Sequence, residues 1–196
     1  GVFVSGAVLP RSYSALRCGV RQCSQSTKKK KQSMSEFPFQ QWVAKAAREA
    51  SLLTCGLETG ALLFASAVSV RVIDRAIADE DVDFIRTFFP VWWPYGRDLM
   101  APLGVTMLAS NAVAAYGAHG RGEMGPRNAH LAAALAAGGI IAWTVCAMSE
   151  DIQSLRDGTA AETLQTARNF GRKHHVRLLA AGAGFIALLY AYHQGK

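Results

Sequence analysis

The sequence predicts an all-α integral membrane protein, a bundle of four transmembrane helices with flanking amphipathic helices. Four stretches of about twenty residues are almost free of charge, at 51–70, 99–118, 129–148 and 176–192. Each is close to the roughly 20 apolar residues that a helix needs to cross a hydrocarbon layer. Strand-like alternation of apolar and polar residues is absent from all four stretches. Because lipid admits only helices or closed barrels as spanning structures, we expect four transmembrane helices.

The first 35 residues form a basic segment that precedes a single four-helix domain at 36–196. The segment has no Asp or Glu, and its basic residues are Arg11, Arg17, Arg21 and the run Lys28–Lys31. An acid-free, Arg-rich and Ser-rich start is typical of a mitochondrial or plastid transit peptide. A basic tail that faces solvent or phosphate is the alternative interpretation. We do not expect a nucleic-acid partner, because no nucleic-acid-binding motif accompanies the lysines.

An amphipathic helix is expected between this segment and the first span. Ser33 and Glu36 have the spacing of a capping box, which predicts a helix start at this point. Apolar residues then recur at helical spacing, at Phe39, Trp42, Val43, Ala46, Ala47 and Ala50. This pattern predicts a helix that lies on the membrane surface before the chain turns inward. An exposed helix or a helix that faces a partner protein fits the same pattern.

Small residues are frequent in all four spans, which favours a compact bundle. The first span contains Gly56 and Gly60 in the Gly-x-x-x-Gly spacing that lets helix backbones approach closely in lipid. Similar Ala and Gly enrichment occurs at 111–117, 132–139 and 180–183. Close helix–helix packing is therefore predicted rather than a single membrane anchor.

Glu58 is the only acidic residue within a predicted span, and an intramembrane carboxylate is by default a functional-site hypothesis. It lies about seven residues, or roughly 10 Å, into the first span. His130, Tyr190 and His193 are expected to approach it from the same side of the membrane, whereas Arg177 starts from the opposite side. A proton-handling or ligand-positioning role is one interpretation. A hydrogen-bonded helix–helix contact is favoured, because no second carboxylate accompanies Glu58.

The connections between the spans differ in character. Residues 71–98 contain a second amphipathic pattern with an acidic face, followed by the aromatic run Phe88–Tyr95, which is typical of an interfacial belt. The prolines in that run argue against a continuous helix. A short Gly- and Pro-containing turn at 120–128 joins the second and third spans. The third connection, at 149–173, is polar and is predicted to be partly helical.

A cluster of basic residues stands before the last span. Arg172, Lys173, His174 and Arg177 are candidates for binding anionic lipid headgroups such as those of cardiolipin. An ordinary basic flank of a membrane span is the alternative. We predict no metal site, because the adjacent His174 and His175 point about 100° apart on a helix. The four cysteines form no Cys-x-x-Cys pair. We expect no cofactor, and no catalytic motif is recognisable.

Between Leu52 and Tyr192 the chain resembles the anthrone-oxygenase-like family of small four-helix membrane proteins. The first span, Gly56–Phe64, is similar to that family's glycine-rich first helix. Phe170-Gly-Arg-Lys-His174-His-Val-Arg177 is similar to its Trp-x-x-x-His-x-x-Arg motif, with Phe170 at the Trp position. The family's Pro-x-Asn motif is missing from Met148–Leu155. A few fungal members are implicated in the cofactor-free oxidation of anthrones, and the resemblance implies catalytic roles for His174 and Arg177.

Two functions are therefore expected from the sequence. The first is a non-catalytic accessory subunit of a mitochondrial inner-membrane complex, such as the respiratory chain or ATP synthase, with a plastid membrane as the alternative location. Other subunits and anionic lipid would be its partners. This function is favoured by the transit-like start and by the lack of a catalytic motif, so an enzyme is the less expected outcome. The alternative is a small membrane oxygenase of the anthrone-oxygenase type.

Overall fold

The computed structural model describes residues 38–158 and 162–194, so the predictions on residues 1–35 and on the capping box at Ser33 and Glu36 lie outside it. Residues Gln41–Lys196 form one compact unit. Its four rods are α2 (Pro38–Phe64) with the π-helix η1 (Ala65–Val70) and α3 (Arg71–Ala78); α4 (Val82–Gly120); α5 (Met124–Trp143) with the π-helix η2 (Thr144–Met148) and α6 (Ser149–Arg156); and α7 (Thr163–Gln194).

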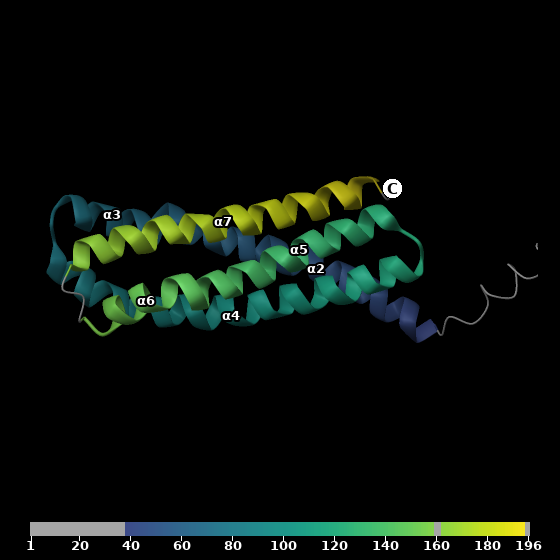
Figure 1. Cartoon of the computed structure of the whole chain (residues 1–196), viewed down its shortest axis with the longest axis horizontal. Helices are drawn as coiled ribbons and strands as arrows, with labels where there is room; N and C mark the ends of the chain where they lie inside the picture. Colours follow the sequence, from purple (N-terminus) through teal and green to yellow (C-terminus); the bar gives the residue numbers. More distant parts are fainter. Residues whose placement is uncertain (1–37, 159–161, 195–196) are drawn as a thin grey trace, which may run out of the picture. The chain divides into compact units, whose positions relative to one another are not determined.

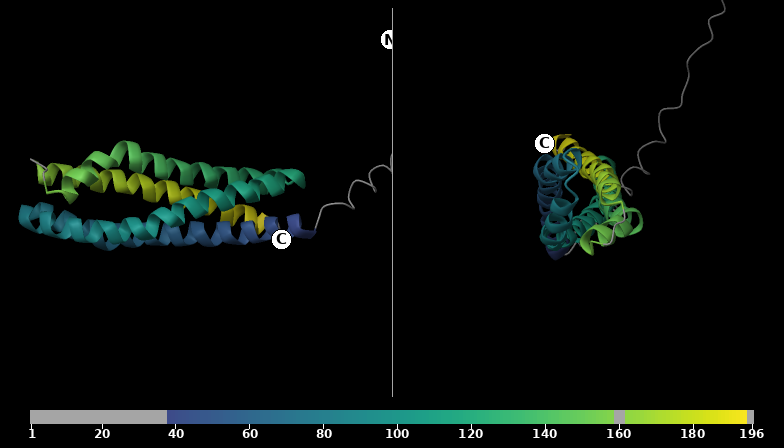
Figure 2. Two further views of the ribbon diagram at one scale, coloured as in Figure 1. Left: turned by 90° about the horizontal axis from the view of Figure 1, so that it is seen from below. Right: turned by 90° about the vertical axis from the view of Figure 1, so that its left-hand side faces the viewer.

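Turns at residues 79–81 and 121–123 join the first three rods, and all four rods run side by side in alternating directions (Figure 1). The end-on view in Figure 2 shows these rods grouped around a common axis. Four helices of the described residues are long and apolar enough to cross a membrane. The predicted all-α, multi-pass membrane bundle is therefore confirmed.

The four charge-free stretches are parts of much longer helices. With 39 residues at a rise of about 1.5 Å each, α4 is about 58 Å long, roughly twice the thickness of a hydrocarbon layer. The predicted surface helix at Phe39–Ala50 is no separate element, because α2 continues through it into the first span without a break. We infer that the half built from residues 51–70, 99–118, 129–147 and 176–192, the membrane half, crosses the lipid. The half built from residues 71–98, 148–158 and 162–175, the projecting half, extends beyond it.

The prediction for the connection at residues 71–98 was wrong in two respects. The chain reverses at residues 79–81, so the predicted amphipathic helix is divided between α3 and α4. The carboxylate of Asp81 caps α4 by accepting a hydrogen bond of 2.9 Å from the backbone N–H of Phe84. The aromatic run that follows is helical, although Pro90, Pro94 and Pro102 all lie inside α4. A proline fixes φ near the helical value and removes one backbone donor, so each of the three costs α4 a helical hydrogen bond without ending the helix.

The projecting half has its own apolar core. Its buried residues are Ile73, Ala76, Ile77, Ile85, Phe89, Met148, Ile152, Leu155, Ala167 and Phe170. Phe89 and Phe170 are fully buried, and their rings meet edge to face at 5.1 Å between centroids. Part of the aromatic run predicted as an interfacial belt therefore packs inside the bundle instead, because α3, α6 and α7 cover that face of α4.

In the membrane half, small residues let the helices approach closely. A Cβ atom added to Gly184 of α7 would lie 3.2 Å from the Cβ of Ala136 on α5. The predicted Gly-x-x-x-Gly contact is only half present. Gly56 faces the ring of Phe185, whereas a Cβ at Gly60 would have no neighbour within 4 Å among the described residues.

The turn between α4 and α5 is held by local charge. Arg121 donates hydrogen bonds of 2.8 and 2.9 Å to the carboxylate of Glu123 and thereby lowers the pKa of that group. Between them Gly122 has a φ of 73°, a conformation that residues with side chains rarely adopt.

Candidate functional site

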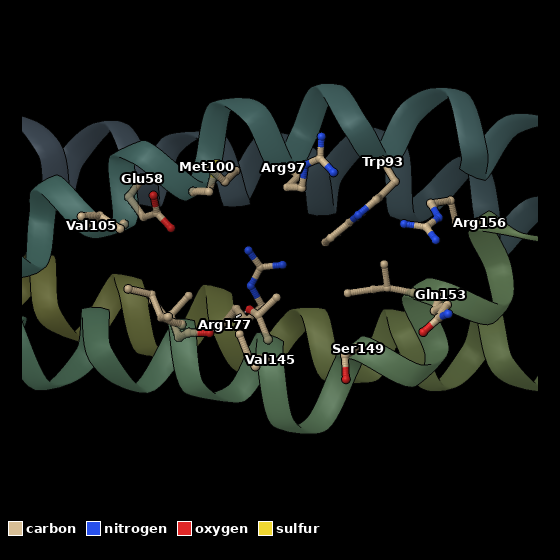
Figure 3. A pocket seen from close by; sticks show the side chains of 16 residues that line it. Glu58, Trp93, Arg97, Met100, Val105, Val145, Ser149, Gln153, Arg156 and Arg177 are labelled. Carbon is tan, nitrogen blue, oxygen red and sulfur yellow. Dashed lines mark hydrogen bonds between the residues drawn. The ribbon is translucent and has the colours of Figure 1, made fainter.

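A cavity of about 530 Å³, which we call the larger cavity, lies where the membrane half meets the projecting half. Most of its lining comes from α4 on one side and from α5, η2 and α6 on the other. Glu58 of α2 and Arg177 of α7 complete it, and both side chains point into the space in Figure 3. Val105 and Val145 also line the cavity and are 59% and 63% exposed, so it reaches the outer face of the bundle.

A smaller cavity of about 270 Å³ lies on the other side of α4. It is lined by α2, η1 and α4, and α7 contributes His174 and Arg177. Four residues line both cavities: Trp93, Arg97, Met100 and Arg177. Each cavity also borders one of the two π-helical segments, a local irregularity that is frequent at functional sites.

Three ionisable side chains at these cavities are almost completely buried. Glu58 is 1% exposed, His174 is 3% exposed and Arg177 is 6% exposed. Oε2 of Glu58 and Nε of Arg177 have no hydrogen-bond partner among the described residues. The ring of His174 approaches the backbone of Leu62, but neither ring nitrogen makes a well-formed hydrogen bond there. Buried polar groups in native proteins normally have partners, so each exception needs an explanation. A polar ligand in the cavities would supply the missing partners.

Glu58 and Arg177 face each other without touching. They interact electrostatically, but they form no ion pair within the described part of the chain. The side-chain contacts of Glu58 therefore differ from those expected from the sequence. His130 is held elsewhere by Asn111, and Tyr190 is 67% exposed.

The expectation that Arg177 starts too far from Glu58 was wrong, because the helices begin earlier than the charge-free stretches do. Since α7 begins at Thr163, Arg177 lies about 21 Å along it. Since α2 begins at Pro38, Glu58 lies about 30 Å along that helix. Both side chains thus come from the middle of the bundle rather than from opposite ends of a span.

Comparison with protein families matches residues 89–187, just over half of the 196-residue chain, to the family described as Anthrone oxygenase. The chain belongs to the anthrone oxygenase family. No curated protein and no solved structure matches it. The region shared with the anthrone oxygenase family includes His174 and Arg177, whereas Glu58 lies before it. The resemblance inferred from the residues is therefore confirmed.

In this anthrone oxygenase family member, the four basic residues before the last span do not share one lipid-facing surface. Arg172 is exposed. Lys173 is held inside the bundle, where its Nζ donates to the carbonyl of Ala147 and to the carboxylate of Asp151, both at 2.7 Å. His174 and Arg177 point into the cavities. Their headgroup role is corrected accordingly, because side chains that are 3% and 6% exposed do not reach lipid headgroups.

The adjacent histidines also have different surroundings. His175 is exposed, and its Nδ1 lies 2.7 Å from the carbonyl oxygen of Gly171, whereas the His174 ring lies 6.1 Å from that of Phe170. Phe170, which stands at the Trp position of the family motif, therefore packs against the motif histidine. Among residues 38–158 and 162–194, no group of three or more His, Cys, Asp or Glu side chains is arranged to hold a metal ion.

A second buried polar cluster lies in the membrane half, and sequence reasoning did not find it. Nδ1 of His130 lies 3.0 Å from Oδ1 of Asn111 and 3.4 Å from Oγ of Ser51. Asn111 donates to the carbonyl of Met107 at 2.8 Å and approaches the sulfur of Cys55 at 3.5 Å. The available signal was the amide of Asn111 in the middle of a charge-free span, since polar residues in membrane helices commonly bond across helices.

Proposed function

We propose that the protein is a small membrane oxygenase that converts an anthrone-type substrate to a quinone with dioxygen. Such a substrate is a flat, largely apolar ketone with a CH₂ group between two aromatic rings. The observation that carries the proposal is the placement of Glu58 and Arg177, both buried and incompletely bonded, on one mostly apolar cavity of about 530 Å³. Cavities of this size and character suit small-molecule ligands. Membership of the anthrone oxygenase family supports the same reaction.

The proposed reaction balances with dioxygen as the only oxidant. A base removes one proton from the CH₂ group, which leaves an enolate with its charge largely on the ketone oxygen. The electron-rich enolate passes one electron to dioxygen, and the resulting radical and superoxide combine to form a carbon–oxygen bond. The peroxide takes up the first proton. Loss of the second proton from the same carbon, together with cleavage of the O–O bond, then yields the new carbonyl and one water molecule.

Three side chains have roles in this proposal. Glu58 removes the first proton, because a carboxylate with a free oxygen on an apolar cavity is a suitable general base. Arg177 binds the ketone oxygen, and its positive charge stabilises the enolate in a site that excludes water. Glu58 then returns this proton to the peroxide oxygen and accepts the second proton from the same carbon. His174, which lines the smaller cavity beside Arg177, positions the Arg177 guanidinium. No cofactor enters the scheme, because the enolate itself reduces dioxygen.

The decisive experiment is turnover by the purified full chain in detergent. We expect 1,8-dihydroxyanthrone to be converted to its quinone, with one dioxygen consumed for each quinone formed, above the rate without protein. Arg177→Gln and His174→Gln should lower kcat/KM by at least tenfold. The matched controls are Arg172→Gln and His175→Gln, since these neighbours are exposed. Wild-type turnover in both Arg177→Gln and His174→Gln would refute the assignment, and no turnover by the wild type would refute the function.

The location and partners are proposed separately. The acid-free basic segment at 1–35 supports an organellar membrane, with the mitochondrial inner membrane first and a plastid membrane second. A fluorescent protein fused after residue 50 should then enter mitochondria or plastids, and a cytosolic signal would contradict the proposal. The predicted accessory subunit of a respiratory or ATP-synthase complex, with anionic lipid such as cardiolipin as a partner, stays a prediction with no observation in its support.

A further inference from the structure

We infer that the substrate is an acid, whose carboxylate is bound by Arg97 and Arg156 at the end of the larger cavity away from Glu58. This inference rests on the proposed function, and it specifies the class of anthrone that the site accepts. It assigns a binding role to two arginines that take no part in the proposed proton transfers.

The ionisable residues that line the larger cavity are unequal in charge. Three are arginines, at 97, 156 and 177, and one is an acid, Glu58. In Figure 3 Glu58 and Arg156 lie at opposite ends of the cavity, with Arg177 and Arg97 between them. Arg177 is placed to bind the ketone oxygen near Glu58, so Arg97 and Arg156 supply the hydrogen-bond donors at the other end. The aspartates that pair with them, Asp98 and Asp157, do not line the cavity.

The present partners of Arg97 and Arg156 are easily exchanged. Each arginine pairs with the aspartate that follows it in the chain, Arg97 with Asp98 at 2.7 Å and Arg156 with Asp157 at 2.8 Å. The two arginine side chains are 54% and 46% exposed. Ion pairs this exposed contribute little to stability, because water and salt screen them. Both guanidinium groups can therefore bind a ligand carboxylate without loss of a strong internal bond.

The apolar part of such an acid also has a place in the cavity. Trp93 lies on the same side as Arg97 and Arg156 in Figure 3. Its ring is held by Phe89, which stacks in parallel at 6.0 Å, and by Phe170, which meets it nearly perpendicularly at 5.9 Å. A tryptophan fixed in this way offers a flat face for an aromatic ring. The ring system and the carboxylate are thus accommodated side by side.

An anionic lipid headgroup has the same chemistry as a substrate carboxylate. We assign the site to the substrate, because the same cavity continues to the buried pair Glu58 and Arg177, for which a lipid chain offers no polar partner. The test below therefore includes a comparison of lipids.

The test compares two substrates that differ by one carboxylate, 1,8-dihydroxyanthrone and 1,8-dihydroxyanthrone-3-carboxylic acid, with the full chain in nanodiscs. We expect kcat/KM for the acid to exceed that for the neutral anthrone by about twofold to thirtyfold, the range for two partly exposed charge pairs. The double variant Arg97→Gln with Arg156→Gln should bring this ratio close to one, and Arg156→Glu should bring it below one. The control is Arg86→Gln with Arg168→Gln, two exposed arginines outside both cavities.

A binding measurement keeps the inference separate from turnover. Anthraquinone-2-carboxylate, a stable analogue of an acidic product, should quench the tryptophan fluorescence of the wild type. Its Kd should rise at least twofold in the double variant. If neither anthrone is oxidised, the proposed oxygenase function fails, and only retention of this arginine-dependent binding would preserve the acid site.

Two results would overturn the inference while the oxygenase stands. One is equal kcat/KM for the acid and the neutral anthrone in the wild type, or a ratio that persists in the double variant. The other is an effect of the double variant that appears only in nanodiscs of anionic phosphatidylglycerol and changes both substrates equally, since the arginines would then bind lipid.

Discussion

Replacement of Glu58 should separate the stability of the bundle from its proposed chemistry. The side chain is 1% exposed, and its Oε2 makes no hydrogen bond among the described residues. A buried polar atom without a partner costs about 1–3 kcal/mol of stability. Glu58→Met keeps the length of the side chain and removes both oxygens. Because Gly104 leaves space beside Oε1, at 4.0 Å from its hypothetical Cβ, the larger methionine end has room.

Because Glu58→Met alone would also leave the buried guanidinium of Arg177 without its opposite charge, we expect the double change Glu58→Met with Arg177→Met to raise the free energy of unfolding by about 1–3 kcal/mol. For a chain of this size, each kcal/mol corresponds to a shift in Tm of about 2–4 °C, so Tm should rise by about 2–12 °C. The Glu58→Met substitution removes the proposed general base. Such groups contribute about 10²- to 10⁴-fold to rate, so kcat/KM for an anthrone should fall by that factor in Glu58→Met and in Glu58→Gln. A gain in stability with a loss of activity is the usual signature of a functional residue.

The assays are thermal unfolding in detergent, followed by near-ultraviolet circular dichroism, and quinone formation followed by absorbance. Glu49→Met on the same helix is the matched control, since Glu49 is exposed, and it should change neither quantity. A lowered Tm in the double variant, together with wild-type turnover in Glu58→Met, would refute the reasoning. Glu58 would then be a structural contact between helices, the interpretation that the sequence alone favoured.

Three further predictions concern packing and buried bonds. Gly184→Leu should destabilise the bundle by about 1–3 kcal/mol in thermal unfolding, because a Cβ atom added at Gly184 would lie 3.4 Å from the backbone of α5. Gly182→Leu is the control and should be tolerated, because a Cβ atom added there would have no neighbour within 4 Å among the described residues. Lys173→Met should lower the free energy of unfolding by about 1–2 kcal/mol, because the side chain loses two hydrogen bonds; the value is reduced because Lys173 is one-third exposed. An unchanged Tm in Lys173→Met would contradict this prediction. Asn111→Leu should cost about 1–3 kcal/mol, because His130 loses its 3.0 Å partner; the further change His130→Leu should recover part of that loss.

The four helices were predictable from the sequence because lack of charge over about twenty residues has one main physical cause, burial in lipid. The ends of these helices were not predictable from the sequence. Phe39–Ala50 has the same amphipathic pattern whether it lies on a membrane or extends a bundle. Pro94 is unfavourable in a helix interior, yet it lies inside α4, where packing against the other helices outweighs the lost hydrogen bond. In both cases the surroundings decide, and a single sequence does not contain them.

The three buried ionisable residues at the cavities were predictable one by one, but their arrangement was not. Glu58 was identified from its charge within a span, and His174 and Arg177 from the resemblance to the family. Their convergence on neighbouring cavities depends on how far each helix extends before the charge-free stretch begins. Trp93 and Met100 were missed, because an aromatic or a methionine at helical spacing fits a core position equally well.

Since α4 is about twice as long as a hydrocarbon layer is thick, we infer that the cavity between the membrane half and the projecting half lies where oil meets water. Dioxygen and the ring system of a flat aromatic ketone are largely nonpolar and concentrate in the oil, while a carboxylate on the rings stays at its polar edge. The proposed reaction would thus draw its two reactants from the phase in which each is most abundant. Water, its second product, would leave toward the polar phase. The bilayer would then act as the reservoir of the reaction, and turnover would follow the total amount of reactant dissolved in lipid rather than its concentration in the surrounding solution.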